Sequence, residues 1–199
     1  MKIIVVGASG TIGKRLTEEL GKRHEVVKAS FSKSDVKVDI TSRASIENMY
    51  HDVGKFDAVI SVTGSAYFGA FEKMTEEDLY MGIRSKLMGQ INLVMVGKNY
   101  INAGGSFTLT SGILSEDPIR DGAALSMVNS GVNGFVVGAA VEFQRGIRLN
   151  VVSPGLVDDS KESLGRWFPG HTTVAMNRVV DGYLKSVEGV GTGRIIRVY

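Results

Sequence analysis

The chain contains 199 residues, of which 43% are hydrophobic and 22% charged, and its 23 basic residues almost balance its 21 acidic ones. These proportions suit a globular protein with one sizeable core and exclude disordered, collagen-like and low-complexity chains. The absence of cysteine excludes disulfide frameworks and thiolate metal sites, and it is typical of a reducing compartment. We therefore expect a cytoplasmic protein. The nearly balanced charge gives no electrostatic footprint for binding nucleic acid, so we expect no nucleic-acid partner.

No apolar stretch is long enough to cross a membrane. The longest, 131–141, is interrupted by Asn133 and falls short of a bilayer span. The four apolar residues after Lys2 lead directly into a glycine turn, whereas a signal peptide needs a longer apolar region. We expect neither a membrane partner nor a signal peptide.

Short apolar, β-branched runs alternate with segments of helical period along the whole chain. The runs predict buried parallel strands at 3–6, 26–27, 36–38, 58–62, 107–110, 147–152 and 195–198. Apolar stripes predict helices at 12–20, 46–53, 75–101, 123–144 and 173–187. This alternation is typical of an α/β protein with a three-layer, doubly wound parallel sheet. No linker or repeat divides the chain, so we expect residues 1–199 to form a single domain.

A glycine-rich loop joins the first predicted strand to the first predicted helix. It reads Gly7-Ala8-Ser9-Gly10-Thr11-Ile12-Gly13. Glycines at this spacing allow a tight turn and let the backbone approach a pyrophosphate, which the free N–H groups of the helix N-terminus bind. The same spacing occurs in simple strand-to-helix turns, but the flanking strand and helix favour a dinucleotide site.

Together with this loop, four segments resemble the short-chain dehydrogenases/reductases over nearly the whole chain. Val38-Asp39-Ile40 is similar to the family segment that contacts adenine, and 105–111 is similar to the strand that ends in the active-site serine, here Ser111. Segment 145–155, Arg-Gly-Ile-Arg-Leu-Asn-Val-Val-Ser-Pro-Gly, is the most specific match, and 192–198 looks like the last strand. The resemblance implies an NAD(P)-binding Rossmann fold of about seven strands, with the cofactor across their carboxyl ends.

The expected cofactor is NADP(H) rather than NAD(H). NAD-specific relatives carry an acidic residue at the end of the second strand, whereas 27–33 contains no Asp or Glu. Ser30, Ser32 and Lys33 could donate hydrogen bonds to a 2′-phosphate, although Lys33 could equally be a solvated loop residue. The resemblance implies further cofactor contacts from the glycine loop (Gly7, Ser9, Gly10, Thr11, Ile12 and Gly13) and from Asp39, Ile40, Thr63, Gly64, Pro154 and Gly155.

The Tyr-x-x-x-Lys pair of the family is missing. In the family the tyrosine acts as general acid or base, while the lysine lowers the tyrosine pKa and holds the cofactor ribose. The tyrosine position falls at Leu125 or Ala124 and the lysine position at Asn129 or Val128, depending on the register, and no Tyr, Lys or His lies within 111–145. Because a general acid contributes ~10²–10⁴ in rate, ordinary carbonyl reduction would be slow.

Three residues are candidates for catalysis without that pair. Ser111 would orient the substrate oxygen, and Tyr67, Lys86 or water would supply the proton. Lys86 falls near the asparagine of the family's proton relay. Each candidate also has a plain structural interpretation: Ser111 caps a turn, Tyr67 packs a loop, and Lys86 is a solvated helix charge.

Several functions remain open from the sequence. The first is an oxidoreductase that transfers hydride between NADP(H) and a small carbonyl or alcohol. The second is a catalytically impaired module that binds the nicotinamide cofactor as a sensor or structural element. A third, a binder of flavin or a nucleoside phosphate, is disfavoured by Asp39 and Gly155. We expect no metal and no covalent nucleophile, because the three histidines lack ligand spacing and no Gly-x-Ser-x-Gly elbow is present.

Two predicted helices indicate self-association. Segment 128–141 is apolar around most of its circumference, which is typical of a helix buried on more than one side. The helix at 75–101 is also rich in apolar positions, and relatives pair through these two helices. We expect a homo-oligomer through 75–101 and 123–144; a monomer that covers both helices itself is the alternative.

Overall fold

Seven parallel strands form a single sheet. The computed structural model describes residues 1–199. The strands are β1 (Lys2–Val6), β2 (Glu25–Ser30), β3 (Val36–Lys37), β4 (Phe56–Ser61), β5 (Ile101–Thr110), β6 (Arg148–Pro154) and β7 (Ile195–Val198). They lie in the order β3-β2-β1-β4-β5-β6-β7, and every pairing is parallel. The predicted doubly wound sheet is therefore confirmed.

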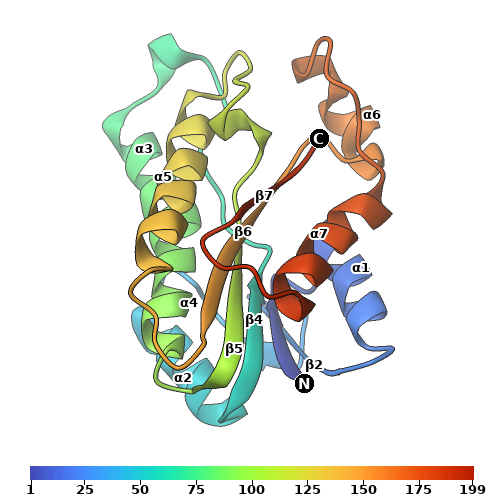
Figure 1. Ribbon diagram of the computed structural model, residues 1–199. Helices are drawn as coiled ribbons and strands as arrows, with labels where there is room; N and C mark the ends of the chain where they lie inside the picture. The colour runs from blue at the N-terminus through green and yellow to red at the C-terminus, as the bar shows by residue number, and fades with distance from the viewer.

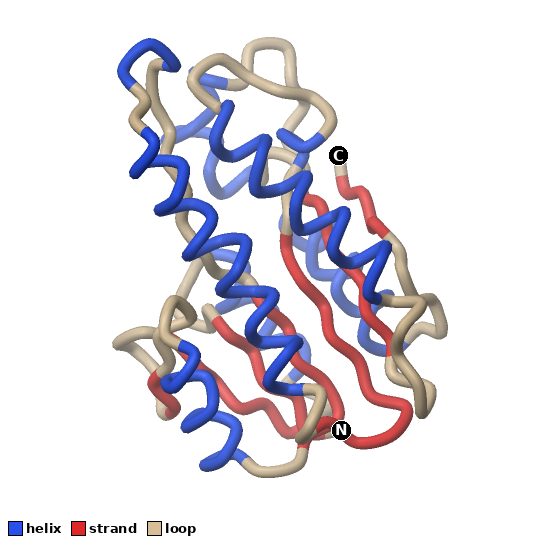
Figure 2. The backbone as a smooth tube through the Cα atoms, turned by 90° about the vertical axis from the view of Figure 1, so that its left-hand side faces the viewer, coloured by secondary structure: helices blue, strands red, loops and turns tan.

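Helices cover both faces of the sheet (Figure 1). One face carries α1 (Thr11–Leu20) and α7 (Met176–Glu188), and the other carries α2 (Arg43–Val53), α4 (Gln90–Gly97) and α5 (Ala123–Ala139). Figure 2 looks onto the second face, where long helices cross in front of the strands. The remaining elements are α3 (Glu76–Gly82), the π-helical segment η2 (Ile83–Gly89), α6 (Lys161–Leu164) and the 3₁₀ turns η1 (Phe71–Lys73), η3 (Ile113–Ser115), η4 (Asp158–Ser160) and η5 (Gly165–Trp167). None of the helices combines the length and the apolar character that a membrane crossing requires.

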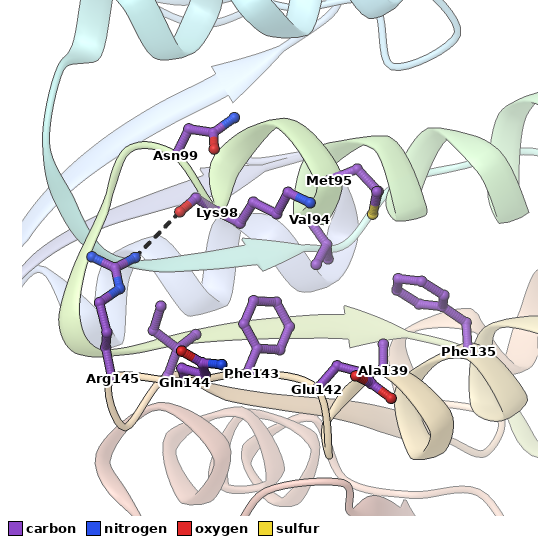
Figure 3. A pocket seen from close by; sticks show the side chains of 11 residues that line it. Val94, Met95, Lys98, Asn99, Phe135, Ala139, Glu142, Phe143, Gln144 and Arg145 are labelled. Carbon is purple, nitrogen blue, oxygen red and sulfur yellow. Dashed lines mark hydrogen bonds between the residues drawn. The ribbon is translucent and has the colours of Figure 1, made fainter.

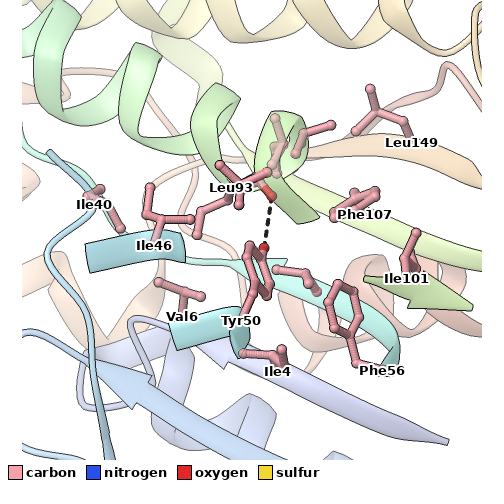
Figure 4. Packing of buried hydrophobic residues seen from close by; sticks show 14 of the residues in the cluster. Ile4, Val6, Ile40, Ile46, Tyr50, Phe56, Leu93, Ile101, Phe107 and Leu149 are labelled. Carbon is pink, nitrogen blue, oxygen red and sulfur yellow. Dashed lines mark hydrogen bonds between the residues drawn. The ribbon is translucent and has the colours of Figure 1, made fainter. Parts of the chain in front are cut away.

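The core consists of two layers of apolar side chains, one on each face of the sheet. Successive strand residues point to opposite faces, so Ile4 packs toward α2 and α4 while Ile3 packs toward α1 and α7. In the first layer the Tyr50 hydroxyl donates to the backbone carbonyl of Leu93 at 2.8 Å, and its ring stacks on Phe56 with centroids 5.2 Å apart (Figure 4). The buried tyrosine thus ties α2 to α4 and fixes the frame on which the strand ends meet.

Two helices end earlier than the sequence predicts. The predicted helix 75–101 ends at Gly97, and Ile101 instead begins β5, where it pairs with Phe56 of β4. The predicted helix 123–144 ends at Ala139, and Phe143 packs from the following loop against Phe107, with ring centroids 6.0 Å apart. In both cases an apolar residue that fits the helical period packs against the core from a non-helical position, Ile101 buried and Phe143 partly buried, so periodicity alone extended the helix too far.

Candidate functional site

A cavity of about 330 Å³ opens at the carboxyl ends of β1, β2 and β4. The sequence predicts eight of the residues that line it: Gly7, Ser9, Gly10, Ser30, Asp39, Ile40, Thr63 and Gly64. Seven others complete the lining: Val6, Phe31, Val38, Thr41, Val62, Ser65 and Ser85. Loops after three neighbouring strands therefore converge on the edge of the sheet where α/β proteins bind nucleotides.

The glycine loop has the geometry of an anion cradle. Gly7 adopts a φ of +92°, and a Cβ there would lie 2.5 Å from the carbonyl oxygen of Val62. A Cβ on Gly13 would overlap the carbonyl oxygen of Gly7 and lie 2.9 Å from the Cα of Ala8. The backbone amides of Ser9, Thr11, Ile12 and Gly13 donate to no protein acceptor. These free N–H groups at the positive end of α1 fit the pyrophosphate of a dinucleotide.

The far end of the cavity offers an apolar slot beside a carboxylate. Oδ1 of Asp39 accepts hydrogen bonds from the amide and the hydroxyl of Thr41, at 2.9 and 2.7 Å. The Phe31 side chain lines the same space and is 74% exposed. An exposed aromatic ring beside Val38 and Ile40 provides a surface on which a planar base can stack. The sequence reasoning missed Phe31, although an aromatic residue directly after the second strand is visible in the sequence.

The three residues expected near a 2′-phosphate differ in their surroundings. Ser30 lines the cavity, but its hydroxyl already accepts a hydrogen bond from the Lys33 amide at 3.1 Å and contacts the Ser34 hydroxyl at 2.9 Å. Ser32 and Lys33 are exposed and lie outside the cavity lining. Ser30 therefore shapes the loop, while the Lys33 side chain is free to reach a ligand.

Lys86 lies against the loop that follows β4. Gly64 adopts a φ of +113°, and a Cβ there would lie 2.6 Å from the Cα and 3.1 Å from the Cγ of Lys86. The lysine side chain thus runs along a residue of the cavity wall, and it forms no ion pair. Part of the side chain stays accessible, yet burial lowers the pKa of Lys86 to about 8. A loosely hydrated ammonium next to a ligand cavity is a candidate for proton transfer.

Buried serine hydroxyls without a partner mark the ends of three neighbouring strands. Ser61 ends β4, Ser111 follows β5 and Ser153 is the next-to-last residue of β6. All three lie on the face that α4 and α5 cover, and none of their Oγ atoms has a hydrogen-bond partner. The Ser111 amide donates to the carbonyl of Val152 at 3.0 Å, which holds this serine in line with β6. Unpaired buried hydroxyls need an explanation, and a bound polar molecule supplies one.

Asn129 of α5 adds an unpaired amide beside Ser111. A Cβ on Gly112, the residue after Ser111, would lie 3.1 Å from Nδ2 of Asn129. Oδ1 of Asn129 is buried without a partner, and its amide group forms no hydrogen bond within the chain. In the sequence Asn129 stands only at a position where the family carries a lysine, and its contact with Gly112 depends on how α5 packs against the end of β5.

The remaining predicted residues lie at the periphery of the cavity. The Tyr67 hydroxyl is directed at Gly69, 2.5 Å from where a Cβ would stand, and it makes no hydrogen bond. Pro154 ends β6, and the Gly155 amide donates to Val198 at 2.9 Å, outside the cavity lining. Phe68 meets Trp167 edge to face at 5.4 Å, so the loop after β4 contacts the segment before α7.

A second cavity, of about 410 Å³, lies at the opposite edge of the sheet (Figure 3). It is formed by the C-terminal ends of α4 and α5, and Val94, Phe135 and Phe143 give it an apolar wall. Arg145 donates to the carbonyl of Lys98 at 3.4 Å across its mouth. Its position at the amino ends of the strands separates it from the glycine loop and from Ser111.

Comparisons with known proteins agree with this architecture. A family model described as enoyl-(acyl carrier protein) reductase matches residues 2–186. The crystal structure of the protein lin1944 from Listeria innocua is 47% identical, with a TM-score of 0.98 and full coverage of both chains. A small-chain dehydrogenase solved in complex with NADPH shares the fold at 24% identity, with a TM-score of 0.88 over 100% of this chain and 96% of that one. A hydroxynaphthalene reductase-like protein of Metarhizium majus is 24% identical over 82% of this chain and 71% of its own length.

Proposed function

Because this chain belongs to the short-chain dehydrogenase/reductase family, we propose that it is an oxidoreductase that transfers hydride between NADP(H) and a small carbonyl or alcohol. The observation that carries this proposal is the cradle of free amides at Ser9, Thr11, Ile12 and Gly13, beside glycines whose missing Cβ atoms leave room for a ligand. When bound, the cofactor supplies or accepts the hydride.

The preference for NADP(H) over NAD(H) rests on the end of β2. No acidic side chain stands at 27–33 to repel a 2′-phosphate or to bind the ribose hydroxyls of NAD(H). The exposed ammonium of Lys33 has no ion-pair partner in the chain and can reach a phosphate there. The small-chain dehydrogenase of the same fold that binds NADPH adds support.

The chemistry at the carboxyl edge would use the residues of this chain in separate roles. The Ser111 hydroxyl would donate to the substrate oxygen and hold the carbonyl carbon at the cofactor. The proton would come from Tyr67, Lys86 or water, because Leu125 and Asn129 replace the usual pair. The second candidate function, a cofactor-binding sensor without turnover, is favoured by this same loss.

The proposal is tested first by thermal unfolding with NADPH, NADH and flavin mononucleotide. A ligand at 100 times its Kd should raise the free energy of unfolding by ~2.7 kcal/mol, or the midpoint by roughly 5–10 °C for a chain of this size. We expect NADPH to give this shift and NADH a smaller one. The Lys33→Glu variant should lose the preference, and Lys185→Glu, an exposed substitution on α7, should keep it.

A panel of aldehydes and ketones then separates the two functions. Oxidation of NADPH that depends on a carbonyl compound would support the oxidoreductase, whereas a shift with NADPH and no turnover would favour the sensor. A well-folded sample that responds to no nicotinamide cofactor would overturn both.

We also propose that two copies pair through α4 and α5. Met81, Met88 and Met95 recur at intervals of seven residues along α3, η2 and α4, and each is between 37% and 40% exposed. On α5, Val137 is 50% exposed, and a Cβ on Gly134 would meet nothing within 4 Å. An apolar stripe beside a smooth, small-residue surface lets two helix pairs approach closely.

A further inference from the structure

We propose that Lys86 is the proton donor of this site, with Ser111 and Asn129 holding the substrate oxygen; this inference rests on the proposed reductase function. The proposal excludes Tyr67 and free water from that role. It also assigns a role to Asn129, which stands where the family carries a lysine: its amide would hold the substrate oxygen.

One buried side chain brings the backbones of Lys86 and Ser111 together. Nε2 of Gln90 donates to the carbonyl of Lys86 at 3.0 Å and to the carbonyl of Thr110 at 2.8 Å. Oε1 of Gln90 accepts from the Thr110 amide at 2.8 Å, and the side chain is fully buried. A single amide group therefore joins the centre of η2 to the residue directly before Ser111.

Helix α5 brings Asn129 to the same place. A Cβ on Gly82 would lie 3.3 Å from Val128, and a Cβ on Gly131 would lie 3.0 Å from Leu87. Helix α5 thus packs closely against α3 and η2 near Asn129 and Lys86. With Asn129 Nδ2 near Gly112, and with Gln90 bonded to the carbonyls of Lys86 and Thr110, η2, the end of β5 and α5 meet in one region.

The local helix geometry is consistent with a functional position for Lys86. The segment 83–89 is π-helical between two α-helices, and such segments are frequent at functional sites. The Lys86 side chain runs along Gly64 of the cofactor cavity and has no carboxylate to neutralise it. Burial that lowers the pKa of Lys86 to about 8 makes its ammonium a better acid than an ordinary lysine near neutral pH. Tyr67, by contrast, is turned toward Gly69 of its own loop.

The reaction balances with these groups. The carbonyl carbon receives the hydride supplied by the reduced nicotinamide, and the electron pair of the C=O double bond moves to the oxygen. That oxygen, held by the Ser111 hydroxyl and the Asn129 amide, takes a proton from Nζ of Lys86. The products are an alcohol, the oxidised cofactor and a neutral amine, which regains its proton from solvent.

The first test measures the amine itself and needs no turnover. The intact protein is treated with a limiting amount of acetic anhydride at pH 7, and the labelling rate of each lysine is read by mass spectrometry. We expect Lys86 to react at least tenfold faster than Lys98, which is exposed on the same helical run, and NADP⁺ to protect it. Equal reactivity of the two lysines, or no protection by NADP⁺, would overturn the proposal.

The second test compares variants in single-turnover oxidation of bound NADPH by the best carbonyl compound of the panel. Lys86→Met should lower the rate by ~10²–10⁴ while the Kd for NADPH, measured by fluorescence, changes less than threefold. Lys98→Met should change neither. Because the acid must be protonated, the wild-type rate should fall as pH rises through about 8, and Lys86→Arg should remove that fall.

The two proposals fail differently. If the wild type turns over and Lys86→Met retains its rate, the assignment of Lys86 is wrong and the reductase function stands. If the wild type binds NADPH but reduces no carbonyl compound, both proposals are wrong. Should Lys86→Met not fold, Asn129→Ala provides the second variant, and we expect it to lower the rate at least tenfold with unchanged NADPH binding.

Discussion

At the scale of single residues, glycines shape the cavity at the carboxyl ends of β1, β2 and β4 through the side chains they lack. Gly13 lies in the first turn of α1, and its Cα faces the carbonyl oxygen of Gly7 with no room for a methyl group. Gly7 and Gly64 add backbone conformations with positive φ that other residues rarely adopt. The polypeptide backbone itself therefore forms this part of the cavity wall.

We predict that Gly13→Ala weakens NADPH binding at least tenfold and lowers the free energy of unfolding by about 1–3 kcal/mol. The new Cβ would push α1 away from the loop and displace the free amides, which is a steric cost of overpacking. Urea unfolding and fluorescence titration measure the two effects. Gly165→Ala is the matched control, since its Cβ would meet only the Lys161 side chain at 3.6 Å. Equal NADPH affinity and equal stability of the two variants would contradict this explanation.

At the scale of elements, the π-helical segment η2 between α3 and α4 carries Lys86 and is bonded to the end of β5. Gln90 links this segment to β5, because its side chain bonds to the carbonyl of Lys86 and to both backbone groups of Thr110. Gly89 lets Ile40 pack closely, since a Cβ there would lie 2.8 Å from the Ile40 side chain. The segment is thus held between the α2 side of the sheet and the end of β5.

We predict that Gln90→Leu lowers the free energy of unfolding by about 2–4 kcal/mol. The substitution removes all three hydrogen bonds of the Gln90 side chain and leaves the buried Thr110 amide without its acceptor, and an unpaired buried group costs about 1–3 kcal/mol before the structure relaxes. Chemical denaturation gives the difference. Gln144→Leu, at an exposed position, should change the stability by no more than about 0.5 kcal/mol. A Gln90→Leu variant as stable as the wild type would mean that the hydrogen bonds of Gln90 contribute little to the free energy of unfolding.

At the scale of the whole molecule, α4 and α5 lie in the layer in front of the strands in Figure 2, and each carries an exposed apolar side chain, Met95 on α4 and Val137 on α5. The exposed methionines and Val141, which is 82% exposed, lie on this outer layer rather than at the glycine loop. Pairing through it would leave the carboxyl edge of each sheet open to ligands. Each copy would then carry its own complete site.

We predict that the protein is a dimer in solution and that Met88→Glu converts it to a monomer. A buried unpaired carboxylate at the centre of the interface would cost far more than the contact gains. Light scattering at micromolar concentration measures the mass. Val190→Glu serves as the control, because Val190 is 96% exposed on the loop before β7 and should leave the dimer intact. A monomeric wild type would refute the pairing.

The amino-acid sequence alone predicted a doubly wound parallel sheet of about seven strands and the family, and both predictions are confirmed. They depend on local signals: alternating apolar runs, helical stripes and a turn motif that each lie within a few residues. The predictions of the helix ends at Gly97 and Ala139 were wrong, since Ile101 and Phe143 fit the helical period but pack against the core from β5 and from the loop after α5. The roles of the predicted site residues stay predictions.

The contacts between residues far apart in the sequence depend on the tertiary structure. Gln90 lies twenty residues before the strand end to which it bonds, and Asn129 comes from a third element. Neither the partial burial of Lys86 nor the exposure of Phe31 follows from its neighbours in the chain, because both depend on how α4, β4 and β2 pack in space. A motif requires only local geometry, whereas a site without its usual motif depends on long-range packing, which a single sequence does not display.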